Sequence, residues 1–322
     1  MIFIRRPETD PWFNIAAEEY LLKHRTEDIA MLWQCDPAVI IGKHQNAMAE
    51  ANLNWTGKRN IPVIRRITGG GTVYHDSGNI NYTVIRTVEQ REKMIDFRQF
   101  TRPVIDFLSE LGIISTFEGK NNLVIEGKKI SGNSAHVHKN RVIHHGTILF
   151  DSNLEILNES IRPTNLHIED KSVQSIRATV TNIRPFLVED MNTKEFKSLL
   201  EKYLINHHNI NSIDSLTFEA NKAISRLAEE KYRGTEWTFG YSPVYSVYLP
   251  IKTEGGQNEL KVKVVRGIIN EITLDFEGES DRQIMTALQK LKGRPHHGLH
   301  RDDYFRTLKE QFPGLKELQR LL

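Results

Sequence analysis

The chain has 322 residues, of which 39% are hydrophobic and 26% charged, and a formal net charge of +2. This composition indicates an ordinary globular protein with one large and one small domain, and its weak, evenly mixed charge does not favour nucleic-acid binding. No apolar run approaches the roughly 20 residues that span a membrane, and the single cysteine, Cys35, cannot form an internal disulfide. Residues 1–6 do not resemble a signal peptide. We therefore expect a cytoplasmic protein without membrane or nucleic-acid partners.

The first hundred residues alternate short apolar runs with one helix. Phe3 and Ile4 predict a strand, and Asp10-Pro11 predicts a helix start, because aspartate caps helices and proline suits the first helical position. Apolar residues at spacings of three and four predict one buried face through about residue 23; they are Trp12, Phe13, Ala16, Ala17, Tyr20 and Leu21. Residues 31–33 and 39–42 predict two more strands.

A glycine-rich loop follows the apolar run at 61–64 and precedes strand-like residues at 72–75. Its sequence is Arg65-Arg66-Ile67-Thr68-Gly69-Gly70-Gly71-Thr72-Val73-Tyr74-His75. Three adjacent glycines allow a sharp turn and let a ligand reach the main chain, and successive N–H groups can bind an anion. Two arginines at its mouth suit phosphate. One hypothesis is a nucleotide phosphate site; the alternative is a glycine turn with two solvated arginines.

The loop matches neither of the common nucleotide-binding motifs. It lacks the G-x-x-x-x-G-K-[ST] pattern, and it joins strands rather than a strand and a helix, as the G-x-G-x-x-G motif would. Any phosphate would therefore lie against a sheet.

A helix is predicted at about 96–111, and a hairpin with a turn at residues 126–128 comes after it. Lys129 opens the second strand of this hairpin, so strand alternation predicts that Lys129 and Ser131 share one face and Ile130 the other. A lysine held over a pocket can stabilise negative charge, whereas most hairpin lysines are simply exposed. Both interpretations remain open at this point.

The second half of the chain adds a strand at 141–150 with the motif His144-His145-Gly146-Thr147, and helices at about 193–207 and 217–231. Beyond an aromatic turn at 237–243, three strands, with a turn at Arg266-Gly267, and two or three helices predict a small α+β unit. We therefore predict two domains, residues 1–243 and 244–322. The residues alone leave a metal site unknown.

Together these motifs resemble a lipoate–protein ligase, in the fold group that also contains biotin–protein ligases. The resemblance covers nearly the whole chain and rests on the following segments in order: residues 10–14 with Glu18-Glu19, 39–46, 65–76, Lys129-Ile130-Ser131-Gly132 and 144–147. It implies an α+β fold with mixed and antiparallel sheets flanked by helices, and a small C-terminal accessory domain.

The resemblance also implies a two-step reaction. Lipoate would attack the α-phosphate of ATP to give lipoyl-AMP, and the lipoyl group would then pass to a lysine of an acceptor protein. Attack of one anion on another requires preplaced cations and N–H donors. Magnesium is expected with the triphosphate. The implied acceptors are lipoyl domains of 2-oxoacid dehydrogenase complexes or the glycine cleavage H protein.

Residue by residue, the resemblance implies that Lys129 is catalytic and bridges the lipoate carboxylate and the α-phosphate. Arg66 would hold phosphate. The remaining residues implied to bind ATP or lipoyl-AMP are Gly70, Gly71, Thr72, Val73, Tyr74, His75, Asn79, Ser131, His145 and Thr147, with Thr68, Asn121, Asn122 and Ala135 as further candidates.

One motif departs from the family pattern, and three rival functions remain. The family commonly has Arg-Asn-Asp where this chain has Lys120-Asn121-Asn122, so a carboxylate is missing there. A cysteine-dependent octanoyl- or lipoyl-transferase would need Cys35 as its nucleophile. Biotin ligation differs only in the acid activated, and a non-catalytic nucleotide or acyl sensor would need neither Lys129 nor turnover.

Overall fold

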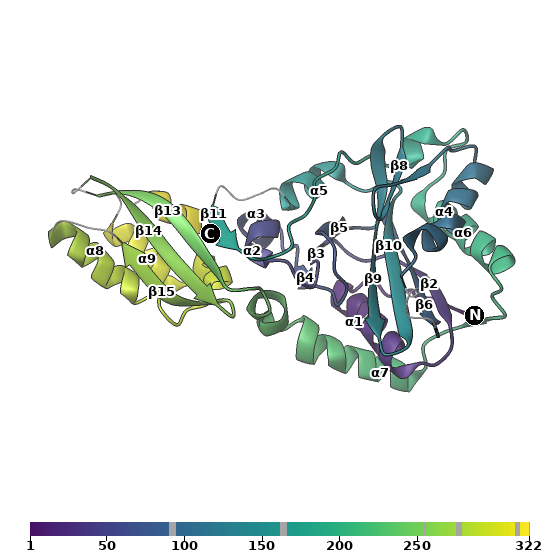
Figure 1. Ribbon diagram of the computed structural model, residues 1–322, viewed down its shortest axis with the longest axis horizontal. Coiled ribbons are helices and arrows are strands. Elements are labelled where there is room, and N and C mark those ends of the chain that lie inside the picture. The colour runs from purple at the N-terminus through teal and green to yellow at the C-terminus, as the bar shows by residue number, and fades with distance from the viewer. Residues whose placement is uncertain (90–94, 162–165, 254–255, 275–278, 313–315, 322) are drawn as a thin grey trace. The chain divides into compact units, whose positions relative to one another are not determined.

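The computed structural model describes residues 1–89, 95–161, 166–253, 256–274, 279–312 and 316–321 (Figure 1). These residues form two compact units: unit 1 contains Met1–Lys43, Ile64–Asn158 and Ser175–Arg233, and unit 2 contains His44–Val63, Glu159–Gln174 and Gly234–Leu322. Within the described ranges, no helix combines the length and the apolar character that crossing a membrane requires. Unit 2 thus draws two segments from before residue 244, and the functional division at 243/244 stays a prediction.

Unit 1 is built on an eight-stranded mixed sheet in the order β12-β1-β2-β6-β10-β9-β8-β7. Strand β1 pairs in parallel with β12 and β2, and the remaining neighbours are antiparallel. The strands are β1 (Ile2–Ile4), β2 (Ile29–Trp33), β6 (Asn79–Thr87), β7 (Thr116–Glu118), β8 (Asn122–Ile125), β9 (Lys128–His138), β10 (Arg141–Leu149) and β12 (Ser212–Asp214). A three-stranded sheet, β4-β3-β5, carries the glycine loop; it consists of β3 (Ala38–Ile41), β4 (Val63–Arg65) and β5 (Val73–His75).

The helices of unit 1 begin at side-chain caps that the sequence supplies. Asp10 accepts a hydrogen bond from the Phe13 N–H, and Asn192 forms a capping box with Glu195. The predicted helix starts near residues 10 and 193 are confirmed. The elements are α1 (Pro11–His24), α4 (Phe97–Glu110), α6 (Thr193–His207), α7 (Phe218–Leu227), the short turns η2 (Arg184–Phe186) and η3 (Ala228–Tyr232), and α5 (Leu154–Ser160), which contains residues of both units.

Helices cover both faces of the large sheet (Figure 1). Phe100, Val104 and Phe107 of α4 and Phe196 of α6 pack with alternate sheet residues into one hydrophobic core. Burying each such side chain contributes roughly 1.5–3 kcal/mol. Helix α1 lies on the other face, where Glu18 reaches β6 and β10. The predicted single apolar face of α1 is wrong, because buried residues occur around much of this helix and include Asn14, Glu18 and Glu19.

Unit 2 contains an antiparallel sheet in the order β11-β13-β14-β15, flanked by short helices. The predicted turn at Arg266-Gly267 is confirmed, and both residues have positive φ. Strand β11 was not predicted. The elements are β11 (His167–Asp170), β13 (Tyr245–Thr253), β14 (Gly256–Val265), β15 (Ile268–Leu274), α2 (Ala47–Glu50), α3 (Leu53–Gly57), α8 (Glu279–Gln289), α9 (Asp303–Gln311), η4 (Glu236–Gly240), η5 (His296–Arg301) and η6 (Lys316–Leu321).

One histidine of the His144-His145 pair belongs to the core under α4. The His144 ring stacks on Phe100 with ring centroids 5.0 Å apart and meets Phe97 edge-on at 5.7 Å. Burial, followed by electrostatic interactions with Arg86 and His145, lowers the pKa of His144 to about 4. The core therefore holds this imidazole in its neutral form.

We predict that His144→Phe reduces the loss of stability on acidification. Because the folded pKa of about 4 lies below the unfolded value, the contribution of His144 is complete above pH 6.5 and is lost as the pH falls towards 4. At pH 5 the protonation of His144 lowers the free energy of unfolding of the wild type by about 2 kcal/mol. Thermal unfolding at pH 7.5 and 5.0 should show a smaller difference in Tm for the variant. The exposed His207 provides a control, His207→Phe, and an unchanged pH dependence in His144→Phe would contradict the prediction.

Candidate functional site

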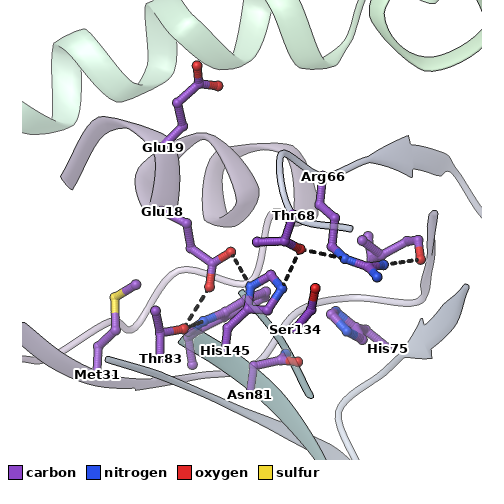
Figure 2. Close-up of polar contacts among 12 residues, drawn as sticks. Glu18, Glu19, Met31, Arg66, Thr68, His75, Asn81, Thr83, Ser134 and His145 are labelled. Atoms are coloured by element: carbon purple, nitrogen blue, oxygen red, sulfur yellow. Dashed lines mark hydrogen bonds and ion pairs between the residues drawn. The ribbon is translucent and has the colours of Figure 1, made fainter. Parts of the chain in front are cut away.

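The site begins with a buried carboxylate on α1 that reaches two strands of the large sheet (Figure 2). Glu18, 1% exposed, accepts a 2.6 Å hydrogen bond from the Thr83 hydroxyl and a 2.8 Å hydrogen bond from His145 Nδ1. Thr83 in turn accepts a hydrogen bond from Trp33 Nε1 at 3.1 Å. Thr83 and His145 are direct neighbours on β6 and β10. One side chain from α1 therefore joins helix and sheet at the middle of unit 1.

The other ring nitrogen of His145 continues the chain of hydrogen bonds to the glycine loop. His145 Nε2 lies 2.8 Å from the Thr68 hydroxyl, and Arg66 Nε donates to that same hydroxyl at 2.8 Å. Because a carboxylate accepts hydrogen bonds, this contact places a proton on His145 Nδ1, and in a neutral imidazole Nε2 then accepts from the Thr68 hydroxyl. Each hydrogen bond in the series Arg66–Thr68–His145–Glu18 then has one defined direction.

Arg66 is the centre of the glycine loop rather than a solvated side chain at its mouth. Besides Thr68, its guanidinium donates to the carbonyls of Ile40 at 3.0 Å, Gly69 at 2.5 Å and Gly71 at 2.8 Å. Burial lowers the pKa of Arg66 to about 10, and the negative charge of Glu18 opposes that shift. The guanidinium remains charged at neutral pH and keeps the loop carbonyls turned towards itself.

The remaining loop residues are also held by specific contacts. Gly70 has φ +82°, and an added Cβ would lie 3.2 Å from Arg66 Nη2. The Thr72 N–H donates to Ser175 Oγ at 2.9 Å, and Ser134 Oγ donates to the Gly69 carbonyl at 2.8 Å. The interpretation of a glycine turn with two solvated arginines is wrong, because Arg65 is also fully buried.

Lys129 lies at the hairpin that the sequence predicted, but a β-bulge changes which neighbours share its face. The register with β8 shifts here, so that Ile130 is an extra residue between Lys129 and Ser131. Ile130 and Ser131 both face the core side, where Ser131 accepts a hydrogen bond from Asn133. The predicted shared face of Lys129 and Ser131 is therefore wrong.

Gly132 replaces Ser131 as the neighbour of the Lys129 side chain. A Cβ on Gly132 would lie 2.9 Å from Lys129 Nζ, so the lysine folds back over the glycine. The backbone of Lys129 is fixed by the 2.8 Å hydrogen bond from its N–H to Thr179 O and the 3.0 Å hydrogen bond from Thr181 N–H to its carbonyl. Burial and then the charge of Arg66 lower the pKa of Lys129. Lys129 is thus not the exposed hairpin lysine of the alternative interpretation.

A second glycine, Gly146, is required by the hydrogen bonds among Tyr82, Asn133 and Asn121. An added Cβ would overlap the Asn133 side-chain oxygen and lie 2.5 Å from Cε1 of Tyr82. The Tyr82 hydroxyl donates to that oxygen, while Asn133 Nδ2 donates to the Asn121 carbonyl at 2.9 Å. The Asn121 side chain donates to the Asn133 carbonyl. Asn121 therefore joins the start of β8 to β9.

The remaining predicted site residues lie on several strands of unit 1. Thr147 and Asn79 lie on the His145 face of the sheet: Thr147 Oγ1 accepts from the Gly132 N–H at 3.2 Å, and Asn79 Nδ2 donates to Asn81 at 3.1 Å. Ala135 pairs with His144, so its side chain lies on the α4 face and only its main chain can contact a ligand on the His145 face. Val73 and Tyr74 lie in β5 opposite Ile40 and Val39, and Asn122 opens β8 opposite Gly132.

His75 contacts Cys35 rather than the glycine loop. Cys35 Sγ lies 3.7 Å from His75 Nδ1, and Trp33 packs against the same imidazole with centroids 5.6 Å apart. Burial, followed by electrostatic interactions with His145 and Arg66, lowers the pKa of His75 to about 3. Burial and then the nearby carboxylates raise the pKa of the Cys35 thiol. The pair therefore does not form a thiolate and an imidazolium.

Sequence reasoning assigned no role to Glu18, Asn133, Ser134 or Ser175. For Glu18 a signal existed: it is three residues after Ile15 and four before Leu22, both fully buried, so helical spacing places it on a buried face. Ser134 and Asn133 could have been assigned by strand alternation only after the bulge was known. Ser175 lies in an irregular segment without any periodic signal.

The sequence profile of the lipoyl protein ligase A/B catalytic domain matches residues 10–205. The chain belongs to this family. Lipoate-protein ligase LplJ of Bacillus subtilis is 34% identical over 87% of this chain and 87% of its own length. Lipoate–protein ligase 1 of Staphylococcus aureus is 35% identical over 85% of this chain and 84% of its own length.

Solved structures of the family share the fold. A lipoate-protein ligase A bound with ATP superposes with a TM-score of 0.63 at 24% identity, covering 74% of this chain and 98% of that one. P. falciparum LipL1 in complex with lipoate gives 0.62 at 22%, covering 91% and 89%. A bipartite lipoate protein ligase of Thermoplasma acidophilum, described with its E2 lipoyl domain, gives 0.63 at 23%, covering 74% and 96%. The expected α+β ligase fold with mixed sheets and flanking helices is confirmed.

We predict that Gly146→Ala unfolds or severely destabilises the protein. The new methyl group would collide with Asn133 and Tyr82, and Tyr82 is held by its stack on Phe100 with centroids 4.8 Å apart. Overpacking of this kind costs typically about 1–3 kcal/mol, and here the loss of hydrogen bonds to Asn133 adds to it. Urea unfolding measures the change. Gly69→Ala is the control, since an added Cβ there meets no atom within 4 Å, and equal losses in both variants would contradict the prediction.

Proposed function

We propose that this protein is an ATP-dependent lipoate–protein ligase, which forms lipoyl-AMP and transfers the lipoyl group to a lysine of a lipoyl domain. Family membership supports the reaction, and relatives in the same fold are described with ATP, with lipoate and with an E2 lipoyl domain. The observation that carries the proposal is the Lys129 ammonium, held over Gly132 and close enough to Arg66 for the two charges to interact.

In the first step, a lipoate carboxylate oxygen forms a bond to the α-phosphorus of ATP, the bond to the β-phosphate oxygen breaks, and pyrophosphate leaves. Both reactants are anions, so their approach requires fixed positive charge. Lys129 supplies that charge at the α-phosphate and the lipoate carboxylate. Arg66 adds a buried positive charge and holds the loop in which the N–H groups of Gly70 and Gly71 receive phosphate.

In the second step, the amine of the acceptor lysine attacks the lipoyl carbonyl carbon, the bond to AMP breaks, and the proton of the amine passes to water. Lys129 remains beside the departing phosphate and stabilises it as AMP leaves. Nucleotide contacts from Thr72, Val73, Tyr74, His75, Asn79, Ser131, His145 and Thr147, with Thr68, Asn121, Asn122 and Ala135, belong to this proposal. For Ser131 and Ala135 only main-chain contacts are proposed, because their side chains face the core.

Magnesium would enter with ATP as part of the substrate. Among the described residues, no group of three or more histidine, cysteine, aspartate or glutamate side chains could hold a metal ion. Magnesium usually keeps several waters and binds substrate phosphates with only one or two carboxylates. The triphosphate is therefore its proposed ligand. The glycine cleavage H protein as a second acceptor, the cytoplasmic location and the catalytic and accessory roles of residues 1–243 and 244–322 stay predictions.

The first test is lipoate-dependent exchange between ATP and pyrophosphate in wild type and Lys129→Ala. Loss of the ammonium should lower the exchange rate by about 10²–10³-fold, the usual effect of removing one donor at a developing negative charge. Lys128→Ala is the matched control, because Lys128 is the exposed neighbour in the same hairpin. No exchange in a folded wild type, or exchange supported by biotin instead of lipoate, would refute the proposal.

We also predict that Cys35→Ala retains lipoylation activity within about twofold. A transferase would need a thiolate, whereas Cys35 is 2% exposed and burial raises the pKa of its thiol. Transfer of lipoate to a purified lipoyl domain with ATP, followed by mass spectrometry, measures the activity. Abolished transfer in a variant with wild-type Tm would instead favour the cysteine-dependent mechanism.

A further inference from the structure

Helix α1 carries two adjacent buried carboxylates, and only one of them reaches the site (Figure 2). Glu19 points away and is held by Lys23 at 2.5 Å, Lys231 at 2.7 Å and the Tyr232 hydroxyl. These three partners compensate for the burial of Glu19, which ties α1 to Lys231 and Tyr232 at the end of unit 1. Glu18, in contrast, accepts hydrogen bonds from the Thr83 hydroxyl and from His145.

The burial of Glu18 is not explained by stability alone. Removing an ion from water costs several kcal/mol, and an apolar residue at the same position of a buried helix avoids that cost. What Glu18 does is determine the proton position on His145 and, through it, the direction of the hydrogen bond between His145 Nε2 and the Thr68 hydroxyl. A neutral side chain of the same shape could not impose this direction, since an amide both donates and accepts.

We propose that Glu18 is a positioning residue for adenylation, which holds His145 as the Nδ1–H tautomer so that Nε2 accepts the Thr68 hydroxyl proton and fixes the Thr68 oxygen that accepts from Arg66, and Arg66 keeps the glycine loop in place. This inference rests on the proposed function, because its effect on activity is an effect on lipoyl-AMP formation. Glu18 does not touch the substrate in this scheme. It acts through His145, Thr68 and Arg66 over three successive hydrogen bonds of 2.8 Å.

The loop is sensitive to this arrangement because the Arg66 guanidinium bonds the carbonyls on both sides of Gly70. With the tautomer reversed, His145 Nε2–H would donate to the Thr68 oxygen, the Thr68 hydroxyl proton would lose its acceptor, and the oxygen would shift relative to Arg66 Nε. The guanidinium could then rotate away from the Gly69 and Gly71 carbonyls. The Gly70 and Gly71 N–H groups would then lose their fixed orientation towards phosphate. A displacement of about 1 Å at a reacting centre lowers rates by about 10²-fold.

The decisive variants are Glu18→Gln, Thr68→Val and their combination, with Glu19→Gln as the matched control. Glutamine can donate to His145 Nδ1 while its oxygen still accepts from Thr83, which transfers the ring proton to Nε2. We expect ¹⁵N NMR of His145 to show this change of tautomer in Glu18→Gln. Hydrogen exchange of the amides at 69–72 should accelerate in Glu18→Gln and Thr68→Val, and kcat of lipoate-dependent exchange should fall about 10²-fold.

The double variant tests whether Glu18 and Thr68 act through the same series of hydrogen bonds. If they do, combining them lowers kcat no further than the more severe single variant, whereas independent effects would multiply and overturn the proposal. Unchanged tautomer and loop protection in Glu18→Gln would also overturn it. So would an equal loss of kcat per folded molecule in Glu19→Gln, whose expected effect is a lowered Tm with wild-type kcat.

The structural measurements separate this inference from the proposed function. If the wild type shows no lipoate-dependent exchange, the ligase proposal fails, but tautomer and amide exchange need no turnover and still decide the role of Glu18. If Glu18→Gln does not fold, Thr68→Val decides. Faster amide exchange at 69–72 in a folded Thr68→Val protein supports the proposal, and unchanged exchange refutes it.

Discussion

A permanently charged guanidinium inside the protein is the constraint on which the rest of the site depends. Arg66 is buried and remains protonated at neutral pH, so its five N–H groups require acceptors, and four bonds are made within the protein. Main-chain carbonyls of β3 and of the glycine loop supply three, and Thr68 supplies the fourth. The loop conformation and the position of Thr68 follow from this requirement, and Glu18 provides the balancing negative charge.

In three pairs of adjacent residues of the same type, one member lies in the site and the other supports the fold. Arg65 donates to the carbonyls of Gly42 and Lys43, whereas Arg66 organises the loop. His144 stacks under α4, whereas His145 joins Glu18 and Thr68. Glu18 and Glu19 likewise leave α1 in different directions (Figure 2). Strand alternation and helical rotation alone produce these differences between neighbours.

Much of this architecture could be predicted from local sequence signals. Proline and aspartate at 10–11, the glycines at 69–71 and the hairpin turn before Lys129 each have a direct physical reason, and the motifs in order identified the family. What failed depends on distant contacts. The bulge at Ile130 results from pairing with β8, and the burial of Arg65 results from its contacts with the carbonyls of Gly42 and Lys43. No local pattern encodes either result.

The two carboxylates of α1 also have a consequence for how the protein is made. Glu18 bonds a partner 127 positions later, and Glu19 bonds one 213 positions later. At about 5–20 residues per second, ribosomal synthesis separates Glu19 from Tyr232 by about 10–40 s. During that interval Glu19 has only Lys23 among its final partners, whereas Thr83 and His145, the partners of Glu18, are synthesised earlier. Helix α1 can therefore complete its packing only after most of unit 1 has been translated.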